Sequence, residues 1–110
     1  LNLNGNDNTL LGTNTGATLI DGYDNVIIGQ AANSSAATSF NEIVIGQGAT
    51  GVSNNSVTLG NADVTAVYMS QDRGATVYCG GLNVSNLPTS DPNVAGQIWS
   101  DSGTLKVSSG

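Results

Sequence analysis

The acidic side chains are the residues whose type could support catalysis. Two carboxyl groups on either side of a glycosidic bond can hydrolyse it, one of them acting as a general acid. The sequence has eight acidic residues, which are Asp7, Asp21, Asp24, Glu42, Asp63, Asp72, Asp91 and Asp101. They are scattered, and no two hold positions that would converge within one chain. We therefore interpret them as solvated residues of corners and loops and predict no catalytic residue. A carboxylate pair shared between chains stays open as an alternative.

Asp7 and Asp24 suggest a second kind of chemistry, because they hold matching positions in two similar stretches of the sequence, 7–12 and 24–29. Like charges that face each other on neighbouring strands destabilise a sheet unless water or a cation relieves them. A Ca²⁺ ion bound by oxygen ligands of Asp7, Asp24 and Asp21 is one hypothesis. Two hydrated turn residues are the favoured interpretation, and no cofactor is predicted.

The sequence lacks histidine and has a single cysteine, Cys79. Catalytic Ser-His-Asp and Cys-His groups are therefore excluded, as are an intrachain disulfide and a zinc site. We expect Cys79 to be a small buried side chain. Residues 46–51 match the dinucleotide-binding pattern Gly-x-Gly-x-x-Gly, but no helix is predicted after them, so we expect no nucleotide site.

The charge balance excludes two classes of partner. Eight acidic residues against two basic ones give a net charge of −6 and a pI near 4.1. Binding to nucleic acid or to an anionic membrane surface requires more Lys and Arg than this. No apolar run approaches the ~18 residues that a membrane-spanning helix needs, so no membrane insertion is predicted.

Three aromatic residues are candidates for receptor binding: Tyr68, Tyr78 and Trp99. Aromatic side chains anchor both protein interfaces and sugar sites. For Trp99, packing at an interface between copies is favoured over stacking on a ligand. The two tyrosines could line a groove, and packing across paired strands explains them equally well.

These residues are positioned by a repeat in the first half of the chain. Four segments, at 8–12, 25–29, 42–46 and 56–60, align on a final glycine. Each predicts a short strand ending at a tight corner, where glycine tolerates a positive φ or a close backbone approach. Asp or Asn one strand-length earlier predicts the opposite corner. One strand and two corners in each period are typical of a solenoid.

The strands are apolar on both faces. Leu10, Ile27 and Val44 lie between neighbours that are also mostly Leu, Ile or Val, and side chains alternate between faces along a strand. We expect one face to fill the interior of the coil and the other to contact a neighbouring chain. A solitary subunit of this size would bury only about two-thirds of its surface. Because hydrophobic residues form 38% of the chain and aromatic ones only 5%, its core would be thin.

The repeat phrases at 42–49 and 55–62 resemble the head repeat of YadA-type trimeric autotransporter adhesins. The resemblance implies a left-handed parallel β-roll with three chains packed side by side around an axis.

The remaining third differs from the repeat. Residues 64–69 and 75–79 predict two strands joined by a turn, and residues 82–84 predict a third. Two prolines make residues 88–92 a loop. Residues 96–100 and 104–108 predict a hairpin around a three-residue turn at 101–103. The phrase at 96–108 resembles a segment of phage tail-fibre and tail-spike proteins, which often precedes an intramolecular chaperone domain.

The sequence thus predicts an all-β chain: a trimeric parallel β-roll or solenoid over 1–62, interlocked β-strands over 63–87, and a loop with a C-terminal β-hairpin over 88–110. We expect a piece of a longer chain, a non-enzymatic structural and host-recognition segment of a phage tail fibre or tail spike. The expected partners are two further copies, other tail or fibre subunits, and a host glycan or protein receptor, with the protein in the virion tail. The alternatives are the head of a bacterial trimeric adhesin at the cell surface and a polysaccharide depolymerase spike.

Overall fold

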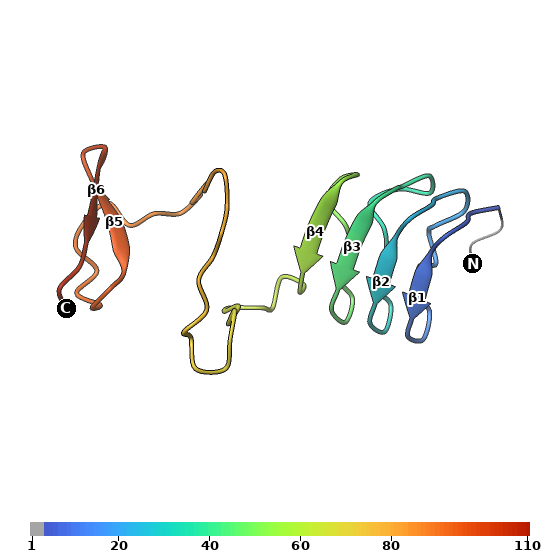
Figure 1. The fold of residues 1–110 in the computed structure, drawn as a ribbon, viewed down its shortest axis with the longest axis horizontal. Coiled ribbons are helices and arrows are strands. Elements are labelled where there is room, and N and C mark those ends of the chain that lie inside the picture. Colours follow the sequence, from blue (N-terminus) through green and yellow to red (C-terminus); the bar gives the residue numbers. More distant parts are fainter. Residues whose placement is uncertain (1–3) are drawn as a thin grey trace. The chain divides into compact units, whose positions relative to one another are not determined.

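The computed structural model describes residues 4–110 and contains strands and loops but no helix in that range, so the predicted all-β class is confirmed. No membrane-spanning helix is therefore found among these residues. The first three residues of the predicted 1–62 segment lie outside the described range. The chain forms two units, one ending at Tyr68 and one covering Met69–Gly110 (Figure 1).

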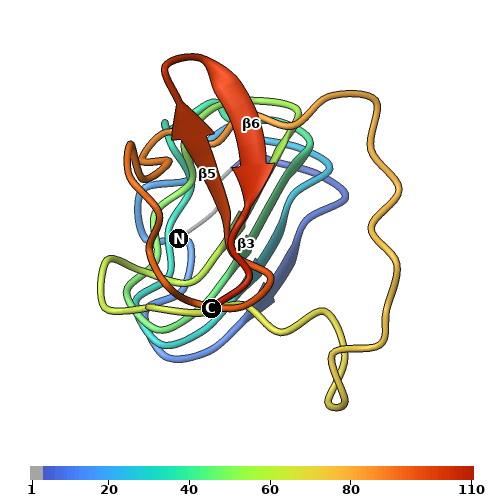
Figure 2. The ribbon, with the colours of Figure 1, turned by 90° about the vertical axis from the view of Figure 1, so that its left-hand side faces the viewer.

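The first unit is a coil with one strand per turn. Its strands are β1 (Thr9–Leu11), β2 (Val26–Ile28), β3 (Glu42–Ile45) and β4 (Ser56–Leu59). They form a parallel sheet in the order β1-β2-β3-β4. In Figure 2 the coils from blue to green lie one behind another. The four predicted repeat strands are thus confirmed, and they pair in sequence order.

The two predicted corners of each coil are confirmed by the backbone. Gly29 has a φ of +135°, and a Cβ there would lie 2.5 Å from the carbonyl oxygen of Gly46 in the next coil, so only glycine fits. The opposite corner has a left-handed residue in every coil, with φ between 51° and 59° at Asp7, Asp24, Asn41 and Asn55. Asn and Asp are the non-glycine residues that adopt this conformation most readily.

The interior of the coil is narrow. Leu10, Ile27, Val44 and Thr58 are paired in register across the four strands, and Ile27 and Val44 are fully buried. The other buried apolar side chains of the described chain are Leu19, Ala32 and Ala49.

Asn25 completes this interior with hydrogen bonds. Its Nδ2 donates to Asn8 Oδ1 at 2.9 Å and to the Ser39 carbonyl at 2.8 Å, while its Oδ1 accepts from the Glu42 N–H at 3.0 Å. These bonds join three successive coils.

The second unit contains an antiparallel hairpin of β5 (Ile98–Asp101) and β6 (Thr104–Val107). The predicted hairpin is confirmed, but its turn is shorter than predicted. Asp101 pairs with Thr104, which leaves a two-residue turn of Ser102 and Gly103, with φ of 52° and 92°. Positive φ at both positions matches the right-handed twist of the flanking strands.

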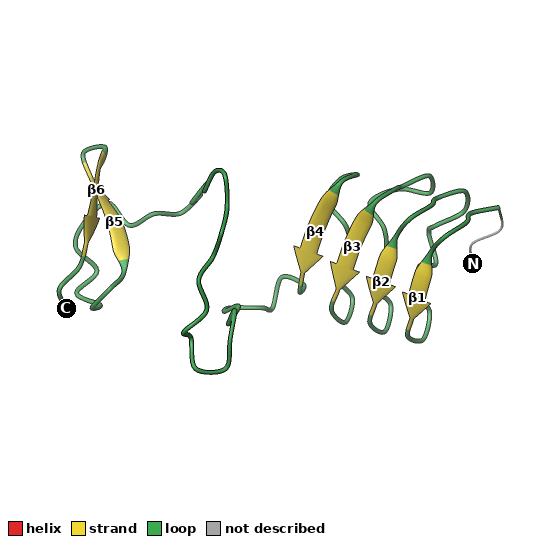
Figure 3. Ribbon diagram, viewed as in Figure 1, coloured by secondary structure: helices red, strands yellow, loops and turns green. Residues whose placement is uncertain are grey.

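The strands predicted at 64–69, 75–79 and 82–84 are absent from this chain. Figure 3 shows the backbone between β4 and β5 as loop. A strand needs a neighbour to accept and donate its ladder hydrogen bonds, and no other segment of the described chain pairs with these residues.

Candidate functional site: the outer face of the parallel sheet

The outer face of the β1–β4 sheet exposes several large apolar side chains. The side chains beside each inward residue point outward, as the alternation predicts. Leu11, Ile43, Ile45, Val57 and Leu59 leave 63%, 37%, 39%, 60% and 48% of their surface exposed. The predicted division into an interior and an exterior apolar face is therefore confirmed within the single chain. We define these five side chains as the outer apolar face.

A shallow groove lies on this face between β3 and β4. Ile43 and Val57 line it together with Asn41, Asn55 and Ser56. The Asn41 amide donates a hydrogen bond to Asn55 Oδ1 at 2.9 Å, which fixes both side chains at the corner of the coil. The groove therefore combines an apolar floor with an uncharged amide rim. The repeat pattern alone does not predict this groove.

The acidic residues do not assemble into a site. Among residues 4–110, no group of three or more His, Cys, Asp or Glu side chains is placed to hold a metal ion. Asp7, Asp21 and Asp24 are exposed, and Asp21 Oδ1 accepts a hydrogen bond from Asn4 Nδ2 at 2.9 Å. The structure therefore does not bring the hypothetical Ca²⁺ ligands together.

Glu42 contradicts the expectation that all acidic residues are solvated. Its side chain is fully buried. Oε2 accepts a hydrogen bond from the Ser35 N–H at 3.0 Å, and Oε1 accepts one from the Ser35 hydroxyl. A signal for this placement was present, because Glu42 lies two residues before Val44 and so shares its inward face.

The Ser34–Ser39 loop folds around this carboxyl group. Ser35 Oγ lies 3.0 Å from Ser39 Oγ, and the Ala36 N–H donates to Ser39 Oγ at 2.8 Å. Ser39 is itself buried. Glu42 therefore holds a loop in place, and nothing in its surroundings suggests substrate access.

The three predicted receptor-binding aromatics differ in their exposure. Tyr68 is 68% exposed and Tyr78 is 94% exposed. Trp99 is half-buried, and its indole N–H is buried without a hydrogen-bond partner in the described chain. The two tyrosines belong to different units, Tyr68 to the first and Tyr78 to the second. Each tyrosine is therefore considered separately, as an exposed aromatic side chain of the unit to which it belongs.

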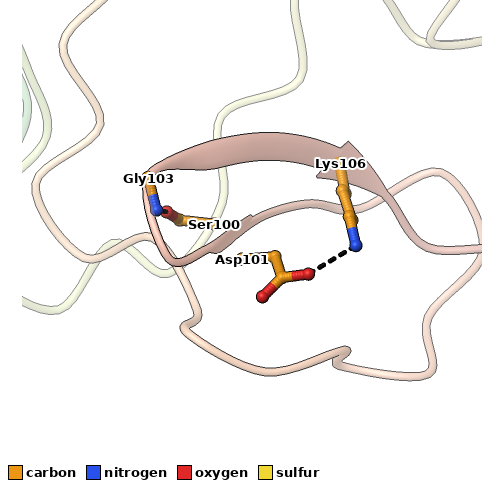
Figure 4. Close-up of polar contacts among 4 residues, drawn as sticks. All are labelled: Ser100, Asp101, Gly103 and Lys106. Atoms are coloured by element: carbon orange, nitrogen blue, oxygen red, sulfur yellow. Dashed lines mark hydrogen bonds and ion pairs between the residues drawn. The ribbon is translucent and has the colours of Figure 1, made fainter.

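The Trp99 ring lies against the side chain of Lys106 on the neighbouring strand. Trp99 pairs with Lys106, whose Nζ lies 5.3 Å from the ring centroid, a cation–π geometry. Lys106 also forms an ion pair with Asp101 (Figure 4). The hydrogen bond from Lys106, supported by its positive charge, lowers the pKa of Asp101. Lys106 thus covers part of the ring that a sugar would need for stacking.

Cys79 is exposed, which contradicts the predicted burial. The prediction failed because Cys79 belongs to the segment that finds no pairing partner within the described chain. Without a second strand over it, its side chain has nothing to pack against.

The chain was compared with protein-family models, with curated proteins and with solved structures, and no significant match was found in any of the three.

Proposed function

We propose that this chain is a non-enzymatic structural and host-recognition segment of a homotrimeric fibre of the kind found in phage tails. The observation that carries the proposal is the outer apolar face, whose residues come from β1, β3 and β4. It is left exposed by a subunit with only five buried apolar side chains in the part of the chain that the structure describes. The resemblance of residues 42–49, 55–62 and 96–108 to trimeric adhesin heads and phage tail fibres supports the same architecture.

The energy available at this face favours association. Burying a Val, Leu or Ile side chain completely contributes about 1.5–3 kcal/mol. The exposed fractions of the five side chains add up to the surface of about two and a half complete side chains. Covering this surface would therefore contribute about 4–7 kcal/mol per chain, before the entropy cost of association. Contiguous exposed apolar patches of this kind mark interaction sites in soluble proteins.

A parallel arrangement of three coils gives the fibre its recognition role. Each copy contributes the same exposed residues, so a low-affinity contact is repeated three times, and the resulting avidity can exceed a single contact by about 10²–10⁴. The receptor in this proposal is a glycan or protein of the host cell surface, and Tyr68 and Tyr78 are the exposed aromatics available to contact it. Other tail subunits are the remaining partners.

Light scattering tests the proposed assembly. A trimer has three times the 11.0 kDa mass of a single chain. Ile45→Lys places a charge in the middle of the outer apolar face and is expected to give monomers at micromolar concentration. Thr50→Lys is the matched control, because Thr50 is also exposed but lies outside the four strands. A wild-type mass equal to that of one chain would overturn the proposed assembly.

Recognition is tested by binding of the assembled protein to an array of bacterial surface glycans and to intact bacterial cells. We expect binding without release of reducing ends, and the Ile45→Lys monomer should bind at least tenfold less tightly because avidity is lost. Release of reducing ends from a bound polysaccharide would instead establish a depolymerase.

A further inference from the structure

β4 presents an open edge at the end of the coil. It pairs with β3 alone, and the Gly60 N–H donates to the Ile45 carbonyl at 2.7 Å. In a parallel ladder, successive residues of a strand bond to opposite sides. Because Gly60 bonds toward β3, the backbone groups of Val57 and Leu59 point to the free side. Such an edge is a template for a further strand.

A segment that lacks a partner follows directly. Residues 64–68, here called the exit arm, contain no charged residue. From Thr65 to Tyr68 the backbone makes no hydrogen bond to any other part of the described chain. Val64, Val67 and Tyr68 expose 47%, 53% and 68% of their surfaces. Val, Thr and Tyr are residues that favour strands, so the exit arm has strand-forming residues without a ladder.

The exit arm does not reach the β4 edge of its own chain. Asn61 directs the chain away, because its side-chain oxygen accepts from the Asp63 N–H at 2.9 Å and its carbonyl accepts from the Val64 N–H at 3.2 Å. To pair parallel to β4, the arm of the same chain would first have to return to the beginning of the strand, which requires a full coil of connecting residues. Even the shortest coil of this chain, from Gly46 to Gly60, is far longer than the short link between β4 and the arm.

We infer that in the assembled fibre the exit arm of each copy pairs with the β4 edge of a neighbouring copy. The inference rests on the proposed trimer and adds a specific contact to it. Each chain has one β4 edge and one exit arm, so in a closed ring of copies every β4 edge can receive an arm. Residues 65–68 lie beyond the Asn61 turn and span about 13 Å when extended, which matches the length of the four-residue strand β4.

Disulfide trapping between differently tagged chains tests whether the exit arm of one copy pairs with β4 of another. All chains carry Cys79→Ser, one type also carries Val57→Cys in β4, and the other carries Thr65→Cys or Ala66→Cys in the arm. Adjacent arm positions are used because one of them shares the face of Val57 in any register. We expect one of the two mixtures, combined in equal amounts, to give a disulfide-linked heterodimer in nearly half of the chains, which is about the limit that random mixing of two chain types in a trimer allows. Gln71→Cys, in the turn beyond the arm, replaces the arm cysteine as the control.

Hydrogen exchange on the unmodified protein provides an independent reading. Paired arms should exchange their amide hydrogens in residues 65–68 at least tenfold more slowly than the Ile45→Lys monomer does. Suppose that the protein is a trimer, that neither mixture cross-links, and that the amide hydrogens of the arm exchange as fast as in the monomer. This result would overturn the pairing of the arm with a neighbouring copy while leaving the proposed fibre intact. A wild-type protein that is monomeric by light scattering would overturn both.

Discussion

Removal of the buried carboxyl group of Glu42 should destabilise the coil through the loop that it holds. Glu42→Ala deletes both hydrogen bonds from Ser35 and leaves a void beside Gly51, where an added Cβ would lie only 2.3 Å from Glu42 Oε2. A hydrogen bond contributes about 0.5–1.5 kcal/mol, and up to about 3 kcal/mol when one group is charged. Large-to-small substitutions at buried sites cost about 2–5 kcal/mol.

Part of this cost is recovered, because Ser35 is exposed and water can replace its lost partner. We therefore expect Glu42→Ala to lower the free energy of unfolding by about 2–4 kcal/mol. For a domain of this size each kcal/mol corresponds to about 4–8 °C in melting temperature. Because association in the proposed trimer would add to the apparent stability, all variants must be compared at one protomer concentration.

Glu42→Gln separates hydrogen bonding from charge. The amide has the same shape, its oxygen can accept from the Ser35 N–H, and its NH₂ can donate to the Ser35 hydroxyl. It also removes the cost of burying a group that has no basic partner. We expect a loss below about 1.5 kcal/mol, within the net value of one hydrogen bond. Asp63→Ala, at an exposed acid of the same unit, is the control and should be neutral.

Urea unfolding followed by circular dichroism measures these differences, and the double variant with Ser35→Ala measures their coupling. The two residues should couple by about 1–2 kcal/mol, because they share the bonds that are lost. Glu42→Ala with wild-type stability, or additive effects of the two substitutions, would refute the role of Glu42 in holding the loop.

Two further predictions concern the corners of the coil and the second unit. Gly29→Ala should cost more than about 2 kcal/mol, because it combines a positive φ with a Cβ 2.5 Å from the Gly46 carbonyl oxygen. Gly48→Ala, with φ +62° and no atom within 4 Å, should cost only the conformational strain of about 1–2 kcal/mol, and equal melting temperatures for the two variants would contradict the steric explanation. In the second unit, hydrogen bonds from the Ser108 hydroxyl and the Asn93 N–H lower the pKa of Asp91. The carboxylate therefore contributes stability that is present above its usual pKa of about 3.9 and is lost as the pH falls through the lower folded value. Asp91→Asn should remove that part of the acid sensitivity below about pH 4, and an unchanged pH profile of unfolding would exclude it.

The coil could be predicted from sequence because its determinants are local and repeated. Each copy has its own glycine corner and its own Asp or Asn corner, and four aligned copies reinforce one another. The alternation that predicts an inward Val44 also predicts an inward Glu42. That consequence was missed because acidic residues are rarely buried without a basic partner.

Residues 64–84 could not be predicted in the same way, since strand formation there depends on a partner and not on the segment alone. Val, Thr and Tyr at 64–68 and 76–78 favour strands, but propensity describes how a residue fits a pleated surface and supplies no neighbouring strand. A lone strand is unstable in water. The exposure of Cys79 has the same cause.

The last coil shows which surfaces of the solenoid still need a partner. The inward-facing side chains that are paired across the four strands are Leu10, Ile27 and Val44, followed by Thr58 in the last strand. A hydroxyl at the final interior position suits a coil with no further coil above it, because terminal repeats of a solenoid face water. The outward-facing side chains do not become polar in the last strand, since Leu59 is apolar and 48% exposed. A solitary solenoid would be expected to become polar on both faces at its end. Only the inner face does so here, and this asymmetry supports the proposed packing of copies side by side through the outer face.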